Sequence, residues 1–357
     1  LVDNFYVPDL LAIGKMYVEK GMIDGGGLAK KRVMSYGDYP DESYTGISDG
    51  DYHKKCIVRS NGVVENFALG VDKATFIPLE GKDFMDPQYL SEEVDHSWFT
   101  YPNGTSTLHP IDGVTEPKFT GPKSGTKEKW EFLDEDKKYS WIKSPTFKGK
   151  TAEVGPLAKY IVVYTKVKQG IIKEPTWAEA MIVRQIDTVS QVLGVPAHVW
   201  MTTMVGRTAC RGLDAQVAAN ISQYFFNKLV SNIKNGDTAV ADMTKFEPNT
   251  WEKDAKGVGL VDAPRGGLGH WIHIKDGRSA NYQCIVPSTW NACPKTAANE
   301  HGAYEDSMID TKVKIADKPL EILKVIHSFD PCLACATHLY NKKGEKIVSV
   351  NTDALCK

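Results

Sequence analysis

Hydrophobic residues recur at helical spacing near the middle of the chain. Thr176 and Glu179 form a capping box, which is typical of the start of a helix. The apolar positions that follow are separated by steps of four and three residues, and they are Ile182, Ile186, Val189 and Leu193. Gly194 and Pro196 end the pattern, so we predict an amphipathic helix between Thr176 and Gly194.

A second amphipathic helix is predicted to begin near Asp214 and to end at Gly236. Its apolar stripe consists of Val217, Ile221, Phe225, Leu229 and Ile233. Two amphipathic helices of about 20 residues each are typical of a helical bundle, in which the apolar faces pack against one another.

The remaining predicted elements are shorter. Residues 1–150 are rich in Gly, Asp, Pro and Tyr, which indicates a short helix at Pro8–Lys20 followed by irregular segments and short strands. Later segments are predicted as strands at Gly257–Val261, Gly269–Ile274 and Tyr282–Val286, a helix at Lys318–His327, and a hairpin with its turn at Asn341–Gly344 and a strand at Lys346–Val350. The apolar run Tyr160–Tyr164 fits either a buried strand or a buried helix. These patterns together predict a helix-rich α+β fold.

Composition narrows the class of protein. The chain has 357 residues, of which 25% are charged and 42% hydrophobic, and this is ordinary for a globular protein with a sizeable core. The formal net charge is −2 and the basic residues are scattered, so we expect no nucleic-acid partner. No apolar run approaches the roughly 18 residues of a membrane-spanning helix. Seven cysteines are too few for a disulfide framework in a chain of this length.

Candidate metal chemistry is concentrated in the segment His327–His338. Cys332 and Cys335 are three residues apart and His338 follows three residues later, so both thiols can converge on one centre. Thiolates suit soft or borderline metals such as nickel, iron, zinc or copper(I). Pro331 restrains the backbone before the pair, and Asp330 could accept a hydrogen bond or relay protons.

The cysteine pair by itself leaves several interpretations open. A structural zinc site is common for C-x-x-C, but none of the other five cysteines supplies a second pair at matching spacing. A redox-active dithiol normally follows a strand and precedes a helix, whereas here a predicted helix comes first. A redox metal or cluster is the third interpretation.

Further blocks resolve this choice through a resemblance. The run D-P-C-x-x-C-x-x-H resembles the C-terminal signature of nickel–iron hydrogenase large subunits. Other blocks resemble the same family and occur in its order: Glu153–Ala158, Gly206–Ala209, Ala263–Trp271 and Val286–Asn291, with weaker support from His96–Trp98 and His109–Gly113. The resemblance implies the large-subunit fold of that family, with a helical bundle and short strands.

The resemblance also implies the ligands of the metal centre. Cys332 is expected to be a terminal nickel ligand, and Cys335 is expected to bridge nickel to an iron that carries carbon monoxide and cyanide. Pro264 and Arg265 are expected to lie over the metals, with backbone amides of their loop donating to one cyanide. The Ser288 hydroxyl is expected to donate to the other cyanide.

The resemblance gives roles to three more residues. Asp330 is expected to pair with Arg265 or to tune the site. A structural magnesium is expected on His338 and on the backbone carbonyl of Cys284, although Cys284 departs from the family's usual aliphatic residue. The run Lys143–Phe147 departs from the family's Lys-Ala-Pro-Arg-Tyr, and we expect this to be a local surface variation.

Two expectations concern the extent of the subunit. The family takes its other two nickel thiolates and a glutamate relay from an R-x-C-x-x-C region, and this sequence has no second C-x-x-C. We therefore expect a C-terminal portion of a large subunit, residues 1–338, with the N-terminal part missing. Residues 339–357 are expected to be an extension that a maturation endopeptidase removes after His338.

The implied function is the reversible heterolytic oxidation of dihydrogen, with electrons passing to an iron–sulfur small subunit. A membrane cytochrome b-type subunit and a position on the periplasmic side of the membrane are implied for the respiratory branch of the family. The alternatives are a dihydrogen sensor, a catalytically incomplete fragment that acts only as a binding module, and an unrelated zinc protein.

Overall fold

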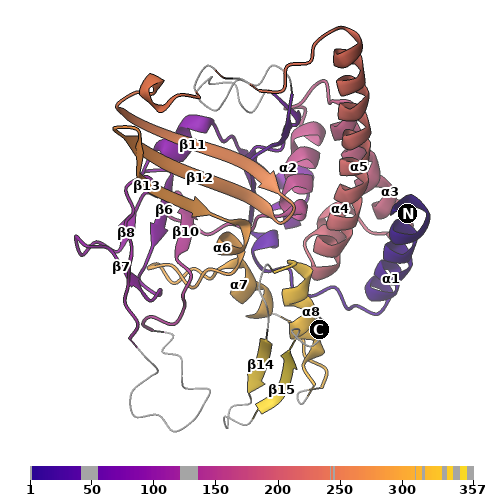
Figure 1. Ribbon diagram of the computed structural model, residues 1–357. Helices are drawn as coiled ribbons and strands as arrows, with labels where there is room; N and C mark the ends of the chain where they lie inside the picture. Colours follow the sequence, from indigo (N-terminus) through magenta and orange to yellow (C-terminus); the bar gives the residue numbers. More distant parts are fainter. Residues whose placement is uncertain are drawn as a thin grey trace.

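A computed structural model describes residues 2–41, 55–120, 136–241, 243, 246–309, 311–315 and 318–331, and the backbone alone of 336–340 and 346–351. The helices are α1 Val7–Glu19, α2 Pro156–Lys168, α3 Trp177–Leu193, α4 Ala197–Met201, α5 Met204–Lys234, α6 Pro287–Asn291, α7 Ala303–Ile309 and α8 Leu320–Ser328. Figure 1 shows α1 to α5 gathered on one side of the molecule and the sheet of β11 to β13 on the other.

Most strands are short and antiparallel. The longest sheet is a meander of β11 Asp254–Ala263, β12 Gly266–Lys275 and β13 Arg278–Ile285. The shorter strands are β1 Arg32–Ser35, β2 Asp38–Pro40, β3 Cys56–Val58, β4 Gly62–Glu65, β5 Thr75–Ile77, β6 Leu90–Glu93, β7 Phe99–Thr100, β8 Thr107–Leu108, β9 Glu116–Pro117 and β10 Ser144–Phe147. They form sheets in the orders β1-β4-β5 and β10-β6-β8 and the pairs β2-β3 and β7-β9. The predicted mixture of helices and strands is therefore confirmed.

Helix α2 lies at the centre of the largest hydrophobic core. Its residues from Pro156 to Lys166 are all buried, and the core also contains Ile182, Ile186 and Val189 of α3 and Leu213, Val217 and Ile221 of α5. The run Tyr160–Tyr164 is thus a buried helix, which settles the choice left open by its pattern. Burial of large apolar side chains contributes about 1.5–3 kcal/mol for each, so this core stabilises the bundle.

The prediction for α3 is confirmed in detail. The Thr176 hydroxyl accepts a hydrogen bond from the Glu179 amide at 3.1 Å, and the Glu179 carboxylate accepts one from the Thr176 amide at 2.8 Å. Gly194 ends the helix with φ of +68°, a left-handed conformation that favours glycine.

The predictions for α5 are partly wrong. The helix begins at Met204 rather than near Asp214. Val217 and Ile221 of the predicted stripe are buried, but the side chains further along the stripe, Phe225, Leu229 and Ile233, are 38%, 57% and 54% exposed. The stripe is therefore a core face only over its first half.

The expected surface variation at Lys143–Phe147 is also wrong. These residues are buried, four of them in β10, which pairs with β6. Lys143 Nζ lies 2.6 Å from Glu92 Oε2, and both side chains are buried. Burial raises the pKa of Glu92, and the neighbouring ammonium of Lys143 opposes that shift. The departure from the family's run thus lies inside the molecule.

The remaining predicted elements are present. The helices at Pro8–Lys20 and Lys318–His327 correspond to α1 and α8, and the three later strands to β11, β12 and β13. The tail forms an antiparallel hairpin of β14 Ala336–Tyr340 and β15 Lys346–Asn351, whose turn lies outside the described residues. In the part of the chain that is described, no helix is both long and apolar enough to span a membrane.

Candidate functional site

The tip of the β11–β12 hairpin brings Pro264 and Arg265 to the centre of the molecule. These two residues form the turn, because Ala263 pairs directly with Gly266. Gly266 has φ of +119°, and a Cβ atom at that position would lie 2.4 Å from the backbone nitrogen of Gly155. Only glycine allows such an approach, so the turn rests on the N-terminal end of α2.

Arg265 and Asp330 are brought together although they are 65 residues apart. The Arg265 Nε donates to the Asp330 backbone carbonyl at 2.6 Å and lies 3.2 Å from its carboxylate Oδ2. Asp330 has φ of +54°, so the backbone just before Pro331 is held in a left-handed conformation. The two side chains are 37% and 41% exposed, which leaves them accessible to a bound group.

Helix α5 supplies a second arginine to the same loop. Arg211 Nη2 donates to the Ser328 carbonyl at 2.7 Å, and its Nε lies 3.9 Å from Asp330 Oδ2. Ser328 at the end of α8 and Asp330, which precedes the Cys332–Cys335 pair, are thus held between α5 and the hairpin tip.

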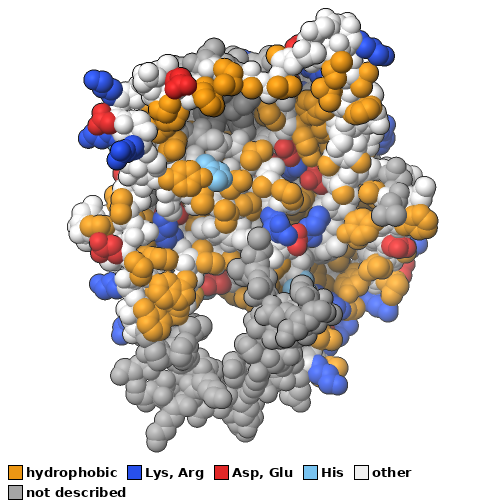
Figure 2. Space-filling view, viewed as in Figure 1, with side chains coloured by type: hydrophobic (Ala, Val, Ile, Leu, Met, Phe, Trp, Pro, Cys, Tyr) orange, Lys and Arg blue, Asp and Glu red, His pale blue; other side chains and the backbone are white. Residues whose placement is uncertain are grey.

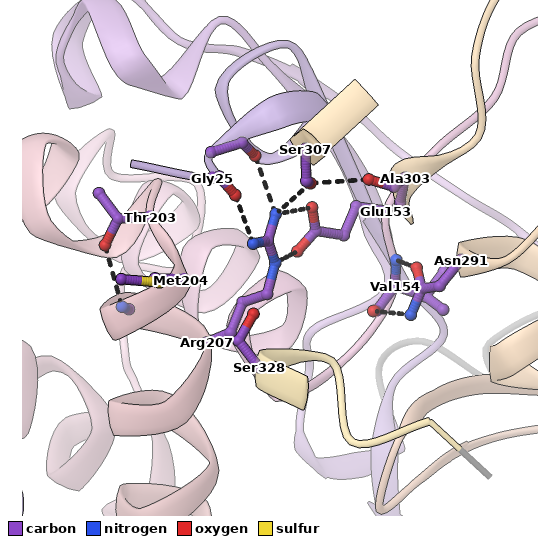
Figure 3. A network of polar contacts seen from close by, with 12 residues as sticks. Gly25, Glu153, Val154, Thr203, Met204, Arg207, Asn291, Ala303, Ser307 and Ser328 are labelled. Carbon is purple, nitrogen blue, oxygen red and sulfur yellow. Dashed lines mark hydrogen bonds and ion pairs between the residues drawn. The ribbon is translucent and has the colours of Figure 1, made fainter. Parts of the chain in front are cut away.

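A buried ion pair fixes the base of this arrangement. Arg207 and Glu153 form two contacts, from Nε to Oε1 at 2.6 Å and from Nη2 to Oε2 at 2.8 Å. The guanidinium also donates to the carbonyls of Gly25 and Gly26, and it lies 3.9 Å from the centre of the Phe329 ring. Figure 3 shows Arg207 at the centre of this network. A bidentate pair with its remaining donors satisfied gives strong geometric specificity.

The segment of Glu153 also positions Ser288. Asn291 of α6 accepts from the Val154 amide at 3.0 Å and donates to the Val154 carbonyl at 2.9 Å, and both bonds are drawn in Figure 3. Ser288 is a half-buried residue in the first turn of this helix. Cys284 lies nearby in the sequence, on β13 opposite His270, and is exposed.

A cleft of about 390 Å³ lies between α2, α5 and the hairpin tip. Its walls include Pro264 and Asp330 together with the acidic residues Asp38, Asp214 and Asp262. Figure 2 shows acidic and basic side chains close together in the hollow between α5 and this hairpin. The cleft thus adjoins the segment that leads into Cys332.

Lys159 of α2 neutralises part of the acidic wall. Its Nζ lies 2.6 Å from Asp38 and 3.1 Å from Asp214, with its own side chain buried. Burial alone lowers the pKa of Lys159, but the carboxylates of Asp214 and Asp38 outweigh that effect and raise the pKa. Burial raises the pKa of Asp38, against the opposing charge of Lys159.

The expected metal ligands can be placed only in part. Cys332 and Cys335 lie outside the described residues, and of His338 only the backbone in β14 is described, opposite Ser349. In the described ranges no group of three or more His, Cys, Asp or Glu side chains could hold a metal ion. The donors fit a nickel–iron centre in their chemistry, because two soft thiols follow a loop held by Arg265 and flanked by a cleft.

Sequence reasoning missed three parts of this site: the ion pair of Arg207 with Glu153, the cluster around Lys159, and Asp262. Glu153, Arg207 and Asp262 each lie in or beside a block that resembles the family, but a block does not reveal its partner. Lys159 lies in an apolar helix, and spacing along the sequence does not reveal that its side chain contacts Asp38 and Asp214.

Comparison with known proteins places the chain in a family. Residues 1–338 match the family model described as nickel-dependent hydrogenase. The chain is 44% identical to the uptake hydrogenase large subunit of Rhizobium leguminosarum bv. viciae and 41% identical to the hydrogenase-1 large chain of Escherichia coli K12. Each alignment covers 98% of this chain and 54% of the relative, so the chain spans about half the length of the curated relatives it matches.

Solved structures share the fold. A [NiFeSe] hydrogenase from Desulfovibrio vulgaris Hildenborough superposes with a TM-score of 0.65 at 24% identity, over 94% of this chain and 57% of that chain. The hydrogenase of Desulfomicrobium baculatum gives a TM-score of 0.63 at 23% identity, over 93% of this chain and 56% of that chain. These likenesses establish the fold.

Proposed function

Because the chain belongs to the nickel-dependent hydrogenase family and has the fold of its large subunit, we propose that it carries half of the catalytic centre of an uptake hydrogenase. The reaction is the heterolytic, reversible oxidation of dihydrogen. The observation that supports this proposal is the convergence of Arg265, Asp330 and the cleft on the segment that leads into Cys332.

Different residues of the chain have different roles at this centre. Cys332 and Cys335 would hold the nickel–iron centre as thiolates, and the Cys332 thiolate would serve as the first base for the proton. When bound, a nickel–iron centre with carbon monoxide and cyanide on iron supplies the site at which dihydrogen is split. The family takes two further thiolates from an R-x-C-x-x-C region, and this sequence has no second C-x-x-C pair.

Arg265 provides a fixed cation at the centre. A guanidinium stays protonated at every physiological pH and presents donors in a rigid plane, so it stabilises developing charge without losing a proton. Asp330 orients that plane through the contacts at 2.6 Å and 3.2 Å. Backbone N–H groups of the loop that follows Pro264, beginning with Arg265, and the Ser288 hydroxyl would donate hydrogen bonds to the cyanides of the bound centre.

The further partners follow from the uptake class. The relatives are named large subunits, and electrons leave this centre through an iron–sulfur small subunit and a membrane cytochrome b-type subunit. That assembly lies on the periplasmic side of the membrane. His338 and the Cys284 carbonyl hold magnesium, and a maturation endopeptidase cleaves after His338 to remove residues 339–357.

The experiment is to replace Cys332 or Cys335 with Ser in the intact large subunit, produced with its small subunit. Both variants are expected to lose most of their nickel and to keep the tail uncleaved, because each lacks one soft ligand. Metal analysis and the mass of the large subunit measure the two effects. Cys284→Ser is the matched control, since it leaves the backbone carbonyl unchanged. Normal nickel content in Cys332→Ser and Cys335→Ser would refute the proposal.

A further inference from the structure

Asp262 is a buried carboxyl group beneath the hairpin tip. It belongs to β11, two residues before Pro264, and is 5% exposed. Its amide donates to the Gly37 carbonyl at 3.2 Å, and its Oδ1 accepts from the Tyr36 amide at 3.2 Å. Asp262 also lies in the wall of the cleft that Pro264 and Asp330 share.

Three oxygen atoms lie within hydrogen-bonding distance of one another: Asp262 Oδ2 and the hydroxyl oxygens of Ser35 and Ser60. Ser35 Oγ contacts Asp262 Oδ2, Ser60 Oγ lies 3.2 Å from the same oxygen, and the two hydroxyl oxygens are 2.8 Å apart. Each serine has one hydrogen to donate. Three contacts therefore need three hydrogens, and the serines supply two, so a protonated carboxyl completes the triangle.

The charged groups that face Asp262 are compatible with a protonated carboxyl. The positive charge of Lys159 on α2 acts on Asp262, but its ammonium is hydrogen-bonded to Asp38 and Asp214. The other titratable groups that face Asp262 are Asp38 and Tyr39 of β2, Tyr36 after β1, and Cys56 of β3. Burial raises the pKa of Asp262 to about 6, against the opposing effect of Lys159. A carboxyl in this state changes its protonation close to neutral pH.

We propose that Asp262, with Ser35 and Ser60, is a proton-holding site that exchanges protons with the cleft during turnover. This inference rests on the proposed function. Splitting of dihydrogen leaves a proton on the first base, and the Asp262 carboxylate takes that proton through the cleft to become a carboxylic acid. The acid then returns the proton to water, and no electron enters or leaves this site.

The first measurement is infrared spectroscopy of the purified enzyme across pH. The carbonyl stretch of a protonated carboxyl should decline as the pH is raised through about 6. It should also shift in deuterium oxide and be missing in Asp262→Asn. Asp254→Asn, at the opposite end of the same strand, is the matched control and should keep the band. A band that survives in Asp262→Asn, or that does not titrate, would overturn the proposal.

A second variant tests the proposal even if Asp262→Asn fails to fold. Ser35 donates a hydrogen bond that lowers the pKa of Asp262. Ser35→Ala should therefore move the midpoint of the band to higher pH, whereas an unmoved midpoint would contradict the triangle of oxygen atoms.

Turnover measurements complete the test. Asp262→Asn should keep its nickel and its KM for dihydrogen, while kcat falls about tenfold and loses its dependence on pH near 6. A variant with the wild-type kcat profile would refute the role in turnover. Because the infrared band does not depend on metal, its presence in an intact, nickel-loaded large subunit that lacks hydrogenase activity would refute the proposed function and leave the proton site standing.

Discussion

At the scale of single residues, the position of Arg265 depends on its planar side chain. One nitrogen, Nε, contacts both the backbone carbonyl and the carboxylate of Asp330. A lysine could keep the charge, but it would replace a rigid fork with a flexible point charge. The guanidinium therefore contributes both a fixed contact geometry and a positive charge to the site.

Arg265→Lys is expected to keep the metal content of the enzyme and to lower dihydrogen oxidation by about a hundredfold to a thousandfold, because a preorganised donor is lost. Metal analysis and turnover of the same preparation measure the two quantities. Arg278→Lys is the control, since Arg278 is an exposed residue of β13. Loss of metal in proportion to activity would show that Arg265 is a structural residue.

At the scale of elements, the hairpin tip and the start of α2 share one tight contact. Gly266 meets the backbone of Gly155, and Gly155 itself has φ of +144°. The ion pair of Arg207 with Glu153 and the bonds of Asn291 to Val154 hold the chain just before this contact. Displacement of the tip would consequently move Pro264 and Arg265 relative to α5 and α6.

Gly266→Ala is expected to lower the thermal unfolding midpoint of the enzyme and to reduce activity strongly. A positive φ costs a non-glycine residue about 1–2 kcal/mol, and the clash at 2.4 Å adds about 1–3 kcal/mol. Gly277→Ala is the matched control. Gly277 also has a positive φ, of +72°, in the next hairpin turn, but a Cβ atom there would meet only Pro248 at 3.8 Å.

Equal effects of the two glycine substitutions would show that backbone strain, and not contact with α2, governs this position. A larger loss of activity in Gly266→Ala, at comparable stability, would show that the contact positions the turn.

At the scale of the whole molecule, the outer half of α5 leaves a hydrophobic face uncovered. Phe226, Leu229 and Ile233 are 59%, 57% and 54% exposed, and Figure 2 shows hydrophobic side chains gathered along this helix. A contiguous apolar face of this kind is typical of a surface that another segment or chain covers.

The chain produced on its own is therefore expected to self-associate in a concentration-dependent manner. Phe226→Gln combined with Leu229→Gln should shift the population towards the monomer in sedimentation velocity experiments. Leu69→Gln is the control, because Leu69 is 64% exposed on a different part of the surface. A monomeric parent chain, or the same shift in Leu69→Gln, would contradict an association through α5.

The difference between the two long helices shows what a local pattern can predict. Helix α3 has its capping box, apolar stripe and terminal glycine in sequence order, so its bounds follow from neighbouring residues. Helix α5 begins earlier than predicted, at Met204, and it contains Gly206 and Gly212 in its first turns. In the structure they allow close packing, since a Cβ at Gly206 would meet Met201 and one at Gly212 would meet Leu10 and Tyr6.

The sequence by itself determined the family, the α+β class and the identity of the candidate ligands, because the cysteine motif and its companion blocks are local patterns of chemistry. Only the tertiary structure decided which of those blocks meet. The contact of Arg265 with Asp330, the pairing of Arg207 with Glu153, and the hydroxyl groups around Asp262 all join residues far apart along the chain. Such contacts depend on how helices and hairpins pack, and packing is a property of the whole fold rather than of any one segment.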